Sequence, residues 1–221
     1  MYNKAYALFK KDFSSELRTR YAINSLAMFI IVAISVILFS IGNEPINQNL
    51  TAGLFWVVIF FTAMSGLARA FVSEEERGTT TTLQLIASPS TVLSGKLLFN
   101  IILVFCMNAV IAILYSAFFE EFAIQNYLLF FLTFVLGNIG LAVASTIIAA
   151  IIAKAGAKGT LYPVLSFPIL LPLILTSVQL TLFSFDGTSF EECKFEIAII
   201  VGYDVIMLTA SYMLFDFIWK D

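Results

Sequence analysis

Six long runs of predominantly apolar residues constrain the fold of this chain more than any other feature of its sequence. A helix needs about 20 such residues to cross the roughly 30 Å hydrocarbon core of a bilayer. Continuous runs of this length favour helices, because the strands of a membrane barrel would show about ten residues of alternating character. The sequence therefore predicts an all-α, polytopic membrane protein in which residues 1–221 form a single transmembrane domain. The six expected transmembrane helices cover approximately residues 22–41, 50–68, 97–119, 127–153, 160–185 and 197–219.

The composition agrees with lipid as the main solvent of the chain. Hydrophobic residues make up 60% of the sequence and charged residues only 12%, whereas about 25% of the residues of a soluble domain are charged. A soluble monomer of 221 residues has too little interior to hide so much apolar surface. The 12 basic residues are spread thinly and the net charge is −3, so no basic field exists that would hold nucleic acid.

The sequence lacks the residues that most catalytic and metal sites require. It contains no His, and Cys106 and Cys193 do not have metal-ligand spacing. The phosphate-binding pattern G-x-x-x-x-G-K-[ST] does not occur, because Gly95-Lys96 lacks both the upstream Gly and the following hydroxyl residue. Ser/His/Asp and Cys/His catalysis both need a His, while serine-lysine and intramembrane aspartyl chemistry stay open. We expect a non-catalytic membrane subunit that does not hydrolyse ATP by itself.

The distribution of Lys and Arg predicts the orientation of the spans. Eleven of the 12 basic residues fall before the first span, in the second and fourth connections, or after the last span. The opposite side receives only Lys194, beside several acidic residues. Because basic residues are enriched on the cytoplasmic side of membrane proteins, we expect both termini to be cytoplasmic.

A stripe of apolar side chains precedes the first span. Tyr2, Tyr6, Phe9, Phe13 and Leu17 recur at spacings of three and four residues, which predicts an amphipathic helix within residues 1–21. The basic residues fall largely off this stripe. We expect the helix to lie in the cytoplasmic membrane interface, with its basic face toward anionic lipid; a solvated leader is the alternative.

The connection over residues 69–96 is the longest hydrophilic segment and the most informative one. A charged cluster is followed by Gly78, which permits a turn, and then by a short run that Ser88-Pro89 ends. Ser90 is expected to cap the helix that continues into the third span. This segment either docks a soluble partner or packs against its own bundle. The residues expected to form the docking loop are Glu74, Glu75, Glu76, Arg77, Gly78, Leu83, Leu85, Ser88 and Pro89.

Several residues inside the expected spans are unusual for lipid-facing helices. Gly137 and Gly140 predict close helix packing in the fourth span. Pro168 and Pro172 share one face of the fifth span and each removes a backbone donor, which predicts a fixed bend or a moving gate. Asp204 is the deepest acid, and it is expected to be paired inside the bundle or to line a transport or subunit interface. It lies about 18 Å along the helix from Asp216, too far for a catalytic dyad.

The segments that carry a family resemblance are short but occur in a consistent order. The loop over residues 69–96 resembles that of ATP-binding-cassette (ABC) type-2 exporter permeases, with a charged stretch, a Gly turn, a leucine-containing helix, a Ser-Pro end and Lys96 at the next span. The whole chain resembles the haem-exporter permeases of cytochrome c maturation, the CcmB family. The matching segments are Glu16-Leu17-Arg18, SIGNEP at residues 40–45, GLFWV at residues 53–57 and FPILLP at residues 167–172. Thr81 departs from the pattern, since many members carry Glu there.

This resemblance implies a permease subunit in the bacterial inner membrane that works with a separate cytoplasmic ABC ATPase and with other cytochrome c maturation membrane subunits. It implies two permease copies per complex, because cassette ATPases generally work in pairs. ATP is then bound by the partner and haem is handled by the complex. Haem ligation usually needs His, Met, Cys or Tyr, and the chain has no His. We therefore expect a protein-derived haem ligand to come from a partner and no cofactor to bind this subunit directly; ligation by Met or Tyr of this chain is the alternative.

Three other functions remain as alternatives. The nearest alternative is a permease of the same exporter class that carries a lipid, drug or polysaccharide, because no residue of the sequence identifies the substrate. An ion-coupled secondary transporter usually has buried ionisable groups and repeated halves, and here only Asp204 is a candidate. A structural membrane subunit without transport is the third.

The predicted topology can be tested by cysteine labelling of intact cells from outside. A reagent that does not cross the membrane should label Glu191→Cys and should not label Glu76→Cys, because eleven of the 12 basic residues place the 69–96 loop on the cytoplasmic side. Efficient external labelling at position 76 would contradict this topology.

Overall fold

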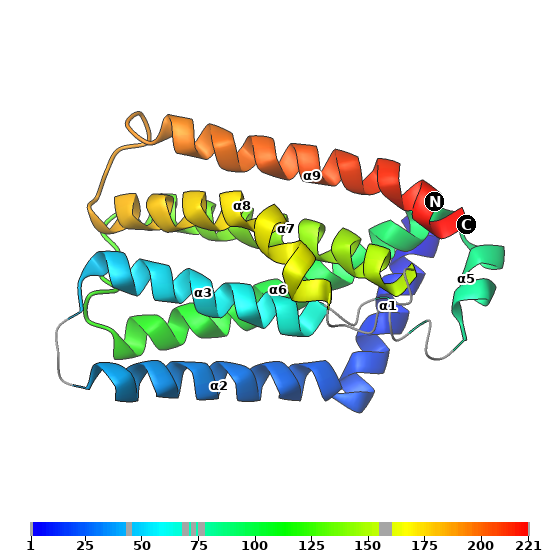
Figure 1. Ribbon diagram of the computed structural model, residues 1–221, viewed down its shortest axis with the longest axis horizontal. Coiled ribbons are helices and arrows are strands. Elements are labelled where there is room, and N and C mark those ends of the chain that lie inside the picture. Colours follow the sequence, from blue (N-terminus) through cyan, green and yellow to red (C-terminus); the bar gives the residue numbers. More distant parts are fainter. Residues whose placement is uncertain are drawn as a thin grey trace.

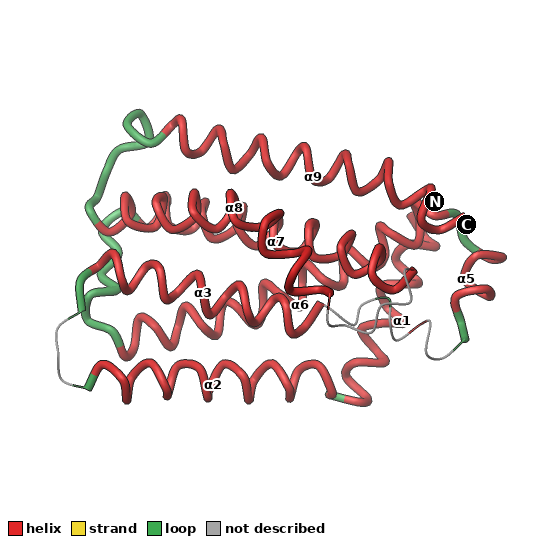
Figure 2. The backbone as a smooth tube through the Cα atoms, in the orientation of Figure 1, coloured by secondary structure: helices red, strands yellow, loops and turns green. Residues whose placement is uncertain are grey.

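The structure, a computed structural model, describes residues 2–42, 46–67, 71, 74, 78–154 and 161–220. Within these ranges the regular secondary structure is entirely helical. The helices are α1 (Tyr2–Thr19), α2 (Tyr21–Ile41), α3 (Gln48–Leu67), α5 (Thr80–Ile86), α6 (Pro89–Phe118), α7 (Tyr127–Lys154), α8 (Leu161–Phe185) and α9 (Lys194–Lys220). Figure 2 shows that loops occupy only the short connections between them.

Six of these helices are long and apolar enough to cross a membrane. The prediction of an all-α protein with six transmembrane helices is therefore confirmed. The spanning segments are Ile23–Ile41, Gln48–Leu67, Pro89–Phe118, Tyr127–Lys154, Val164–Phe185 and Lys194–Trp219.

The third spanning helix begins earlier than the apolar pattern indicated. α6 starts at Pro89, with Ser88 at the N-cap position, so the expectation that Ser90 caps this helix is wrong. Proline suits the first helical position because it has no N–H to leave unpaired and its φ angle is already helical. The 30 residues of α6 extend for about 45 Å, so the helix continues well beyond the thickness of the hydrocarbon core.

α3 and α7 form the centre of the bundle, and α2 and α9 lie on its outside. The apolar window of α7 is 78% buried and that of α3 is 61% buried, against 17% for α2 and for α9. α7 packs against α3, α6, α8 and α9. Figure 1 shows these helices side by side, with α2 and α9 at opposite edges and both chain ends at the end of the bundle where α1 and α5 lie.

Small residues of α7 allow its neighbours to approach closely, as the sequence predicted. A Cβ atom at Gly137 would overlap the Trp56 ring of α3, lying 2.9 Å from Cζ3. A Cβ atom at Gly140 would overlap Asp204 of α9 and would lie 2.8 Å from Leu173 Cδ2 of α8. A side chain of a neighbouring helix thus occupies the space beside each glycine, and any larger residue at either position would collide with it.

Pairs of buried polar side chains join the helices inside the bundle. The Trp56 indole N–H donates to Thr181 Oγ1 at 2.8 Å. Asn108 Nδ2 donates to Asn138 Oδ1 at 2.6 Å and thereby joins α6 to α7. Such bonds matter in a bilayer because its hydrocarbon offers these groups no alternative partner.

α8 contains Pro168 and Pro172, and both side chains are exposed. Each proline removes a helical hydrogen bond, and Figure 1 shows α8 changing direction in the half of the helix that carries them. The prolines therefore bend the helix. Whether this bend moves during function stays a prediction.

The contact between Gly137 and Trp56 predicts the effect of a single methyl group. Gly137→Ala should lower the stability of the protein by about 1–3 kcal/mol, because overpacking displaces the indole ring. Gly202→Ala is the matched control, since a Cβ atom there meets nothing within 4 Å. Thermal unfolding in detergent, followed by tryptophan fluorescence, measures both; equal midpoints for the two variants would contradict the packing described.

Candidate functional site

α5 follows α3 and precedes α6 in the sequence. It lies beyond the end of the bundle (Figure 1). Among its seven residues some apolar side chains are buried and others are exposed, because residues two apart on a helix point in different directions. Leu83 is 5% exposed and packs inward, while Leu85 is 83% exposed and Ile86 is 59% exposed. α5 therefore presents an exposed apolar edge.

The turn that precedes α5 is closed by local hydrogen bonds. Gly78 has a φ angle of +65°, a conformation that favours glycine. Thr79 N donates to the Glu74 carbonyl oxygen at 3.0 Å, and the Thr79 hydroxyl also donates to the Glu74 carboxylate. Three residues of the expected loop site, Glu75, Glu76 and Arg77, lie outside the described residues.

Glu74 is the centre of a buried ion cluster that joins three parts of the chain. Lys11 Nζ of α1 lies 2.7 Å from Glu74 Oε1, and Lys96 Nζ of α6 lies 3.0 Å from the same atom. Lys96 Nζ also lies 2.9 Å from Asp12 Oδ2 of α1. The side chains of Glu74 and Lys96 are each only 7% exposed. The two lysines and two acids balance each other's charge.

The electrostatics of this cluster keep Glu74 ionised. Burial by itself would raise the pKa of the Glu74 carboxyl, but the positive charge of Lys96 and hydrogen bonds from Lys11, Thr79 and Lys96 outweigh it and lower the pKa to about 2. Glu74 is therefore negatively charged at neutral pH. The cluster acts as a fixed electrostatic link between α1, the loop and α6.

Sequence reasoning singled out Glu74 as a charged loop residue and missed its partners. Lys11 is 63 positions and Lys96 is 22 positions away in the sequence. The one sequence feature that could have indicated this cluster is Asp12, an acid within the predominantly basic N-terminal segment. Because these residues meet only through tertiary packing, no local pattern predicts their pairing.

Aromatic side chains attach the same loop to the end of α9. The Lys96 ammonium lies 5.8 Å from the centre of the Phe71 ring, close enough for a cation–π attraction. Phe71 packs against Phe215 and Trp219 with ring centres 5.5 and 6.3 Å away. Gln84 Nε2 of α5 donates to the Trp219 carbonyl oxygen at 2.7 Å. The loop thus contacts α9 as well as α1 and α6.

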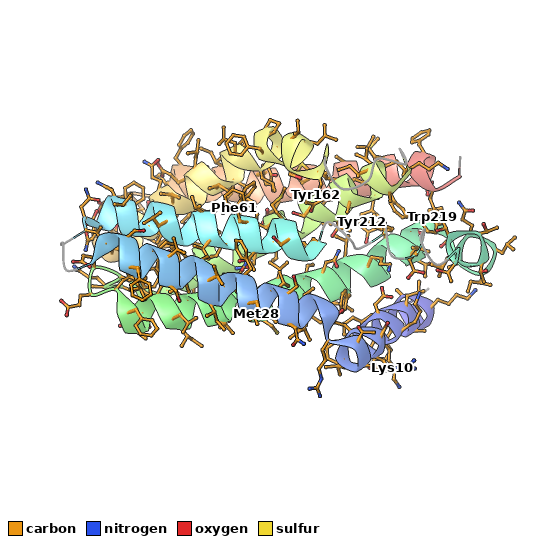
Figure 3. The ribbon with its side chains drawn as sticks, turned by 60° about the horizontal axis from the view of Figure 1, so that its bottom comes forward. Lys10, Met28, Phe61, Tyr162, Tyr212 and Trp219 are labelled. Carbon is orange, nitrogen blue, oxygen red and sulfur yellow. The ribbon has the colours of Figure 1, made fainter. Side chains whose placement is uncertain are left out.

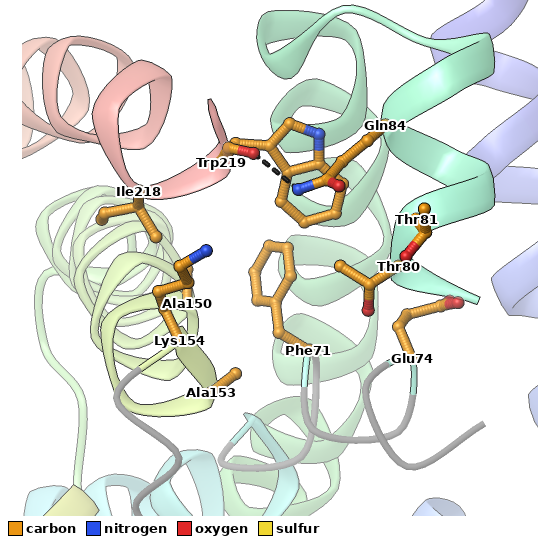
Figure 4. Close-up of a pocket in the computed structure, with 10 residues that line it drawn as sticks. All are labelled: Phe71, Glu74, Thr80, Thr81, Gln84, Ala150, Ala153, Lys154, Ile218 and Trp219. Atoms are coloured by element: carbon orange, nitrogen blue, oxygen red, sulfur yellow. Dashed lines mark hydrogen bonds between the residues drawn. The ribbon is translucent and has the colours of Figure 1, made fainter. Parts of the chain in front are cut away.

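A cavity of about 220 Å³ opens between the loop, the end of α7 and the end of α9. Figure 4 shows Phe71 and Trp219 in the middle of the lining residues, with Thr80 and Thr81 on one side of them and Lys154 of α7 on the other. Thr81, the residue at which the chain departs from the exporter pattern, is one of the lining residues.

α1 packs against the first turns of α6 and meets α2 at a sharp elbow. A Cβ atom at Gly95 would lie 2.8 Å from Leu8 Cβ and 3.0 Å from the Ala5 carbonyl oxygen, so the two helices are in close contact. At the elbow, Arg20 has a φ angle of 51° and Glu16 Oε1 accepts a hydrogen bond from Ile23 N at 3.0 Å. Glu16 thereby satisfies a backbone donor at the start of α2.

Three side chains of the apolar stripe of α1 are exposed, although Phe13 and Leu17 also line an apolar pocket with residues of α6. Tyr6, Phe13 and Leu17 are 61%, 40% and 51% exposed. Figure 3 shows Lys10 of α1 and Trp219 of α9 at the same end of the bundle. The predicted helix is therefore present, while its position in a membrane interface stays a prediction.

Asp204 and the prolines lie apart from the loop. Asp204 is separated from Trp219 by 15 residues of α9, which is about 22 Å along the helix. It lies beside Gly140, near the bent helix α8, where the Tyr203 hydroxyl donates to the Ile169 carbonyl oxygen at 3.1 Å. The structure thus contains two separate candidate regions, one at the end of the bundle and one within it.

Six apolar spans and an exposed helix outside the bundle define a multi-pass membrane protein. The family model of the CcmB protein matches residues 3–215, which is nearly the whole chain. This chain belongs to the CcmB family, the permease subunits of haem-exporting ABC transporters that act in cytochrome c maturation. The resemblance noted in the sequence is therefore confirmed. A comparison with curated proteins finds no match to the chain.

The ion cluster predicts a large effect of removing the charge of Glu74. Glu74→Gln should destabilise the protein by about 3 kcal/mol, because Lys96 would be left buried with less negative charge around it. Glu191→Gln is the matched control: its pair with Lys194 is 3.3 Å long but highly exposed, and such pairs contribute about 0–1 kcal/mol. Thermal unfolding and limited proteolysis of α1 measure the difference, and equal effects of both variants would argue against the cluster.

The pKa of Glu74 gives this link a pH dependence. Because the pKa is lowered from 4.5 to about 2 in the folded protein, the stabilisation is complete above about pH 4.5 and is lost as the pH falls toward 2. The wild type should lose this contribution over that range, and Glu74→Gln should not. Parallel pH profiles of unfolding for the two proteins would contradict the assignment.

Proposed function

We propose that this permease subunit couples ATP hydrolysis by a separate cytoplasmic ABC ATPase to movement of its own membrane helices. The docking element is the loop from Glu74 to Pro89, with α5 as the surface that touches the ATPase. The observation that carries this proposal is the high exposure of Leu85 and Ile86 on a helix outside the bundle. Solvent-exposed apolar side chains of this kind are typical of a surface that binds another protein.

The contacts of the loop support a mechanical role. α5 is followed at once by α6, so a displacement of α5 acts directly on a spanning helix. The Lys96–Asp12 and Lys11–Glu74 pairs transmit the same displacement to α1. The elbow held by Glu16 then connects α1 to α2. Through Gln84 and Trp219 the loop also contacts α9.

The charge distribution supports the orientation in this proposal, and the CcmB family match supports the location. In this proposal both termini and the loop are cytoplasmic, α1 lies in the interface, and the protein is in the bacterial inner membrane. The support is the excess of Lys and Arg on one side of the spans and the presence of both chain ends beside α5 (Figure 1).

The partners in this proposal are the ATPase, the other cytochrome c maturation membrane subunits and membrane lipid, with no nucleic acid. The subunit binds no cofactor directly, ATP stays on the ATPase and haem is handled by the complex. We propose two permease copies, one docking surface for each member of an ATPase pair. Native mass spectrometry that finds one copy per ATPase dimer would contradict this stoichiometry.

An ABC type-2 exporter of another cargo, such as a lipid, drug or polysaccharide, is the second candidate. It uses the same loop, so the loop does not distinguish the two. The match of residues 3–215 to the CcmB family favours the role in cytochrome c maturation.

The docking role of α5 predicts a graded series of effects. Leu85→Asp should strongly reduce recovery of the ATPase in a pull-down and reduce the yield of cytochrome c in cells, because it places a charge in an apolar contact. Reversal of the charges at Glu75 and Glu76 should reduce both less. Membrane insertion should not change, since the loop lies between the spans.

Leu85→Met is the matched control, because it keeps an exposed apolar side chain of similar size and should keep both readouts near wild-type levels. If Leu85→Asp also leaves ATPase recovery and cytochrome c yield unchanged, the loop is not the coupling element. The connection over residues 154–159 and helix α1 are then the next candidates.

A further inference from the structure

Asp204 is a carboxylic acid buried in the interior of the bundle. The residue is only 8% exposed, and neither side-chain oxygen has a hydrogen-bond partner in the part of the chain that the structure describes. Asp204 is ten residues beyond the start of α9, which is about 15 Å along the helix and half of the roughly 30 Å hydrocarbon core. The acid is therefore deep in the membrane-spanning region.

Two neighbouring helices pack closely beside this carboxyl group. Gly140 of α7 makes room for it, because a Cβ atom at that position would overlap Asp204 Oδ1. Leu173 of α8 covers the same glycine, with Cδ2 2.8 Å from the position of that Cβ atom. These two contacts, a glycine and an apolar side chain, bring neither a hydrogen-bond donor nor a counter-ion to the carboxyl group.

The helices packed against α9 offer no nearby charge to balance an ionised Asp204. The charged residue of α6 is Lys96, which is held by Glu74 and Asp12. The charged residue of α7 is Lys154, 14 residues from Gly140 and about 21 Å along the helix. α8 has no charged residue, and the adjacent Tyr203 hydroxyl donates to Ile169.

We propose that Asp204 is a proton-binding site: it holds a proton while α9 packs against Gly140 and releases it to water when α9 moves away. A carboxylate without a counter-ion or hydrogen-bond donor is strongly disfavoured in an apolar interior, whereas the neutral acid is tolerated. On release the O–H bond breaks, its electron pair stays on the carboxylate, and the proton passes to an entering water molecule. The ligand of this site is the proton itself, and the site does not depend on ATPase docking.

Infrared spectroscopy of the purified protein in lipid nanodiscs tests the protonation directly. At neutral pH the wild type should show the carbonyl stretch of a protonated carboxylic acid. Asp204→Asn should abolish that band, and Asp216→Asn, the control on the same helix, should keep it. Loss of only a carboxylate band in Asp204→Asn, or an unchanged acid band, would overturn the proposal.

Isotope labelling answers the same question without a variant, in case Asp204→Asn fails to fold. Labelling of aspartate with ¹³C should shift the acid band of the wild type, and an unshifted band would overturn the proposal. The pH dependence of thermal unfolding is the second readout. Rising pH should lower the midpoint of the wild type more steeply than that of Asp204→Asn, whose amide cannot ionise, and equal slopes would contradict the coupling to helix packing.

Discussion

The absence of hydrogen-bond partners in hydrocarbon is the constraint on which this structure depends. Most polar side chains in the spans find partners either in the backbone of their own helix, as Thr62 does, or on another helix, and a partner on another helix requires the two helices to approach closely. The small-residue face of α7 makes that approach possible. Trp56 packs on Gly137 and donates to Thr181, so one side chain joins α3, α7 and α8. Asn138 of α7 accepts a hydrogen bond from Asn108 of α6. α7 is thereby the helix around which the others are arranged.

Outside the bundle, charge replaces apolar packing as the main connection. The cluster around Glu74 and Lys96 joins segments that the sequence separates, and its burial makes each charge dependent on the others. The consequence is that α1, the loop and the first turns of α6 behave as one unit. A partner that binds α5 would therefore act on this unit, which is the physical support for the coupling role proposed above.

Glu74 and Asp204 show how surroundings decide the state of a buried acid. Both are largely hidden from solvent. Glu74 has two lysines and a hydroxyl group as partners, and these lower its pKa to about 2 and keep it charged. Asp204 lies against Gly140, which supplies neither a side-chain donor nor a charge, and its carboxyl oxygens have no hydrogen-bond partner among the described residues. The first acid fixes a contact, and the second is suited to take up and release a proton.

The sequence by itself determined the number and kind of helices, because a span of about 20 apolar residues is a local property. It also determined the family, the turn at Gly78, the end of α5 before Ser88-Pro89 and the close packing at Gly137. Only the tertiary structure decided which residues meet. It placed Lys11 and Asp12 against Glu74 and Lys96, turned Leu83 inward and Leu85 outward, and left Asp204 beside a glycine. These outcomes depend on how helices distant in sequence approach each other, and hydropathy and spacing carry no information about that approach.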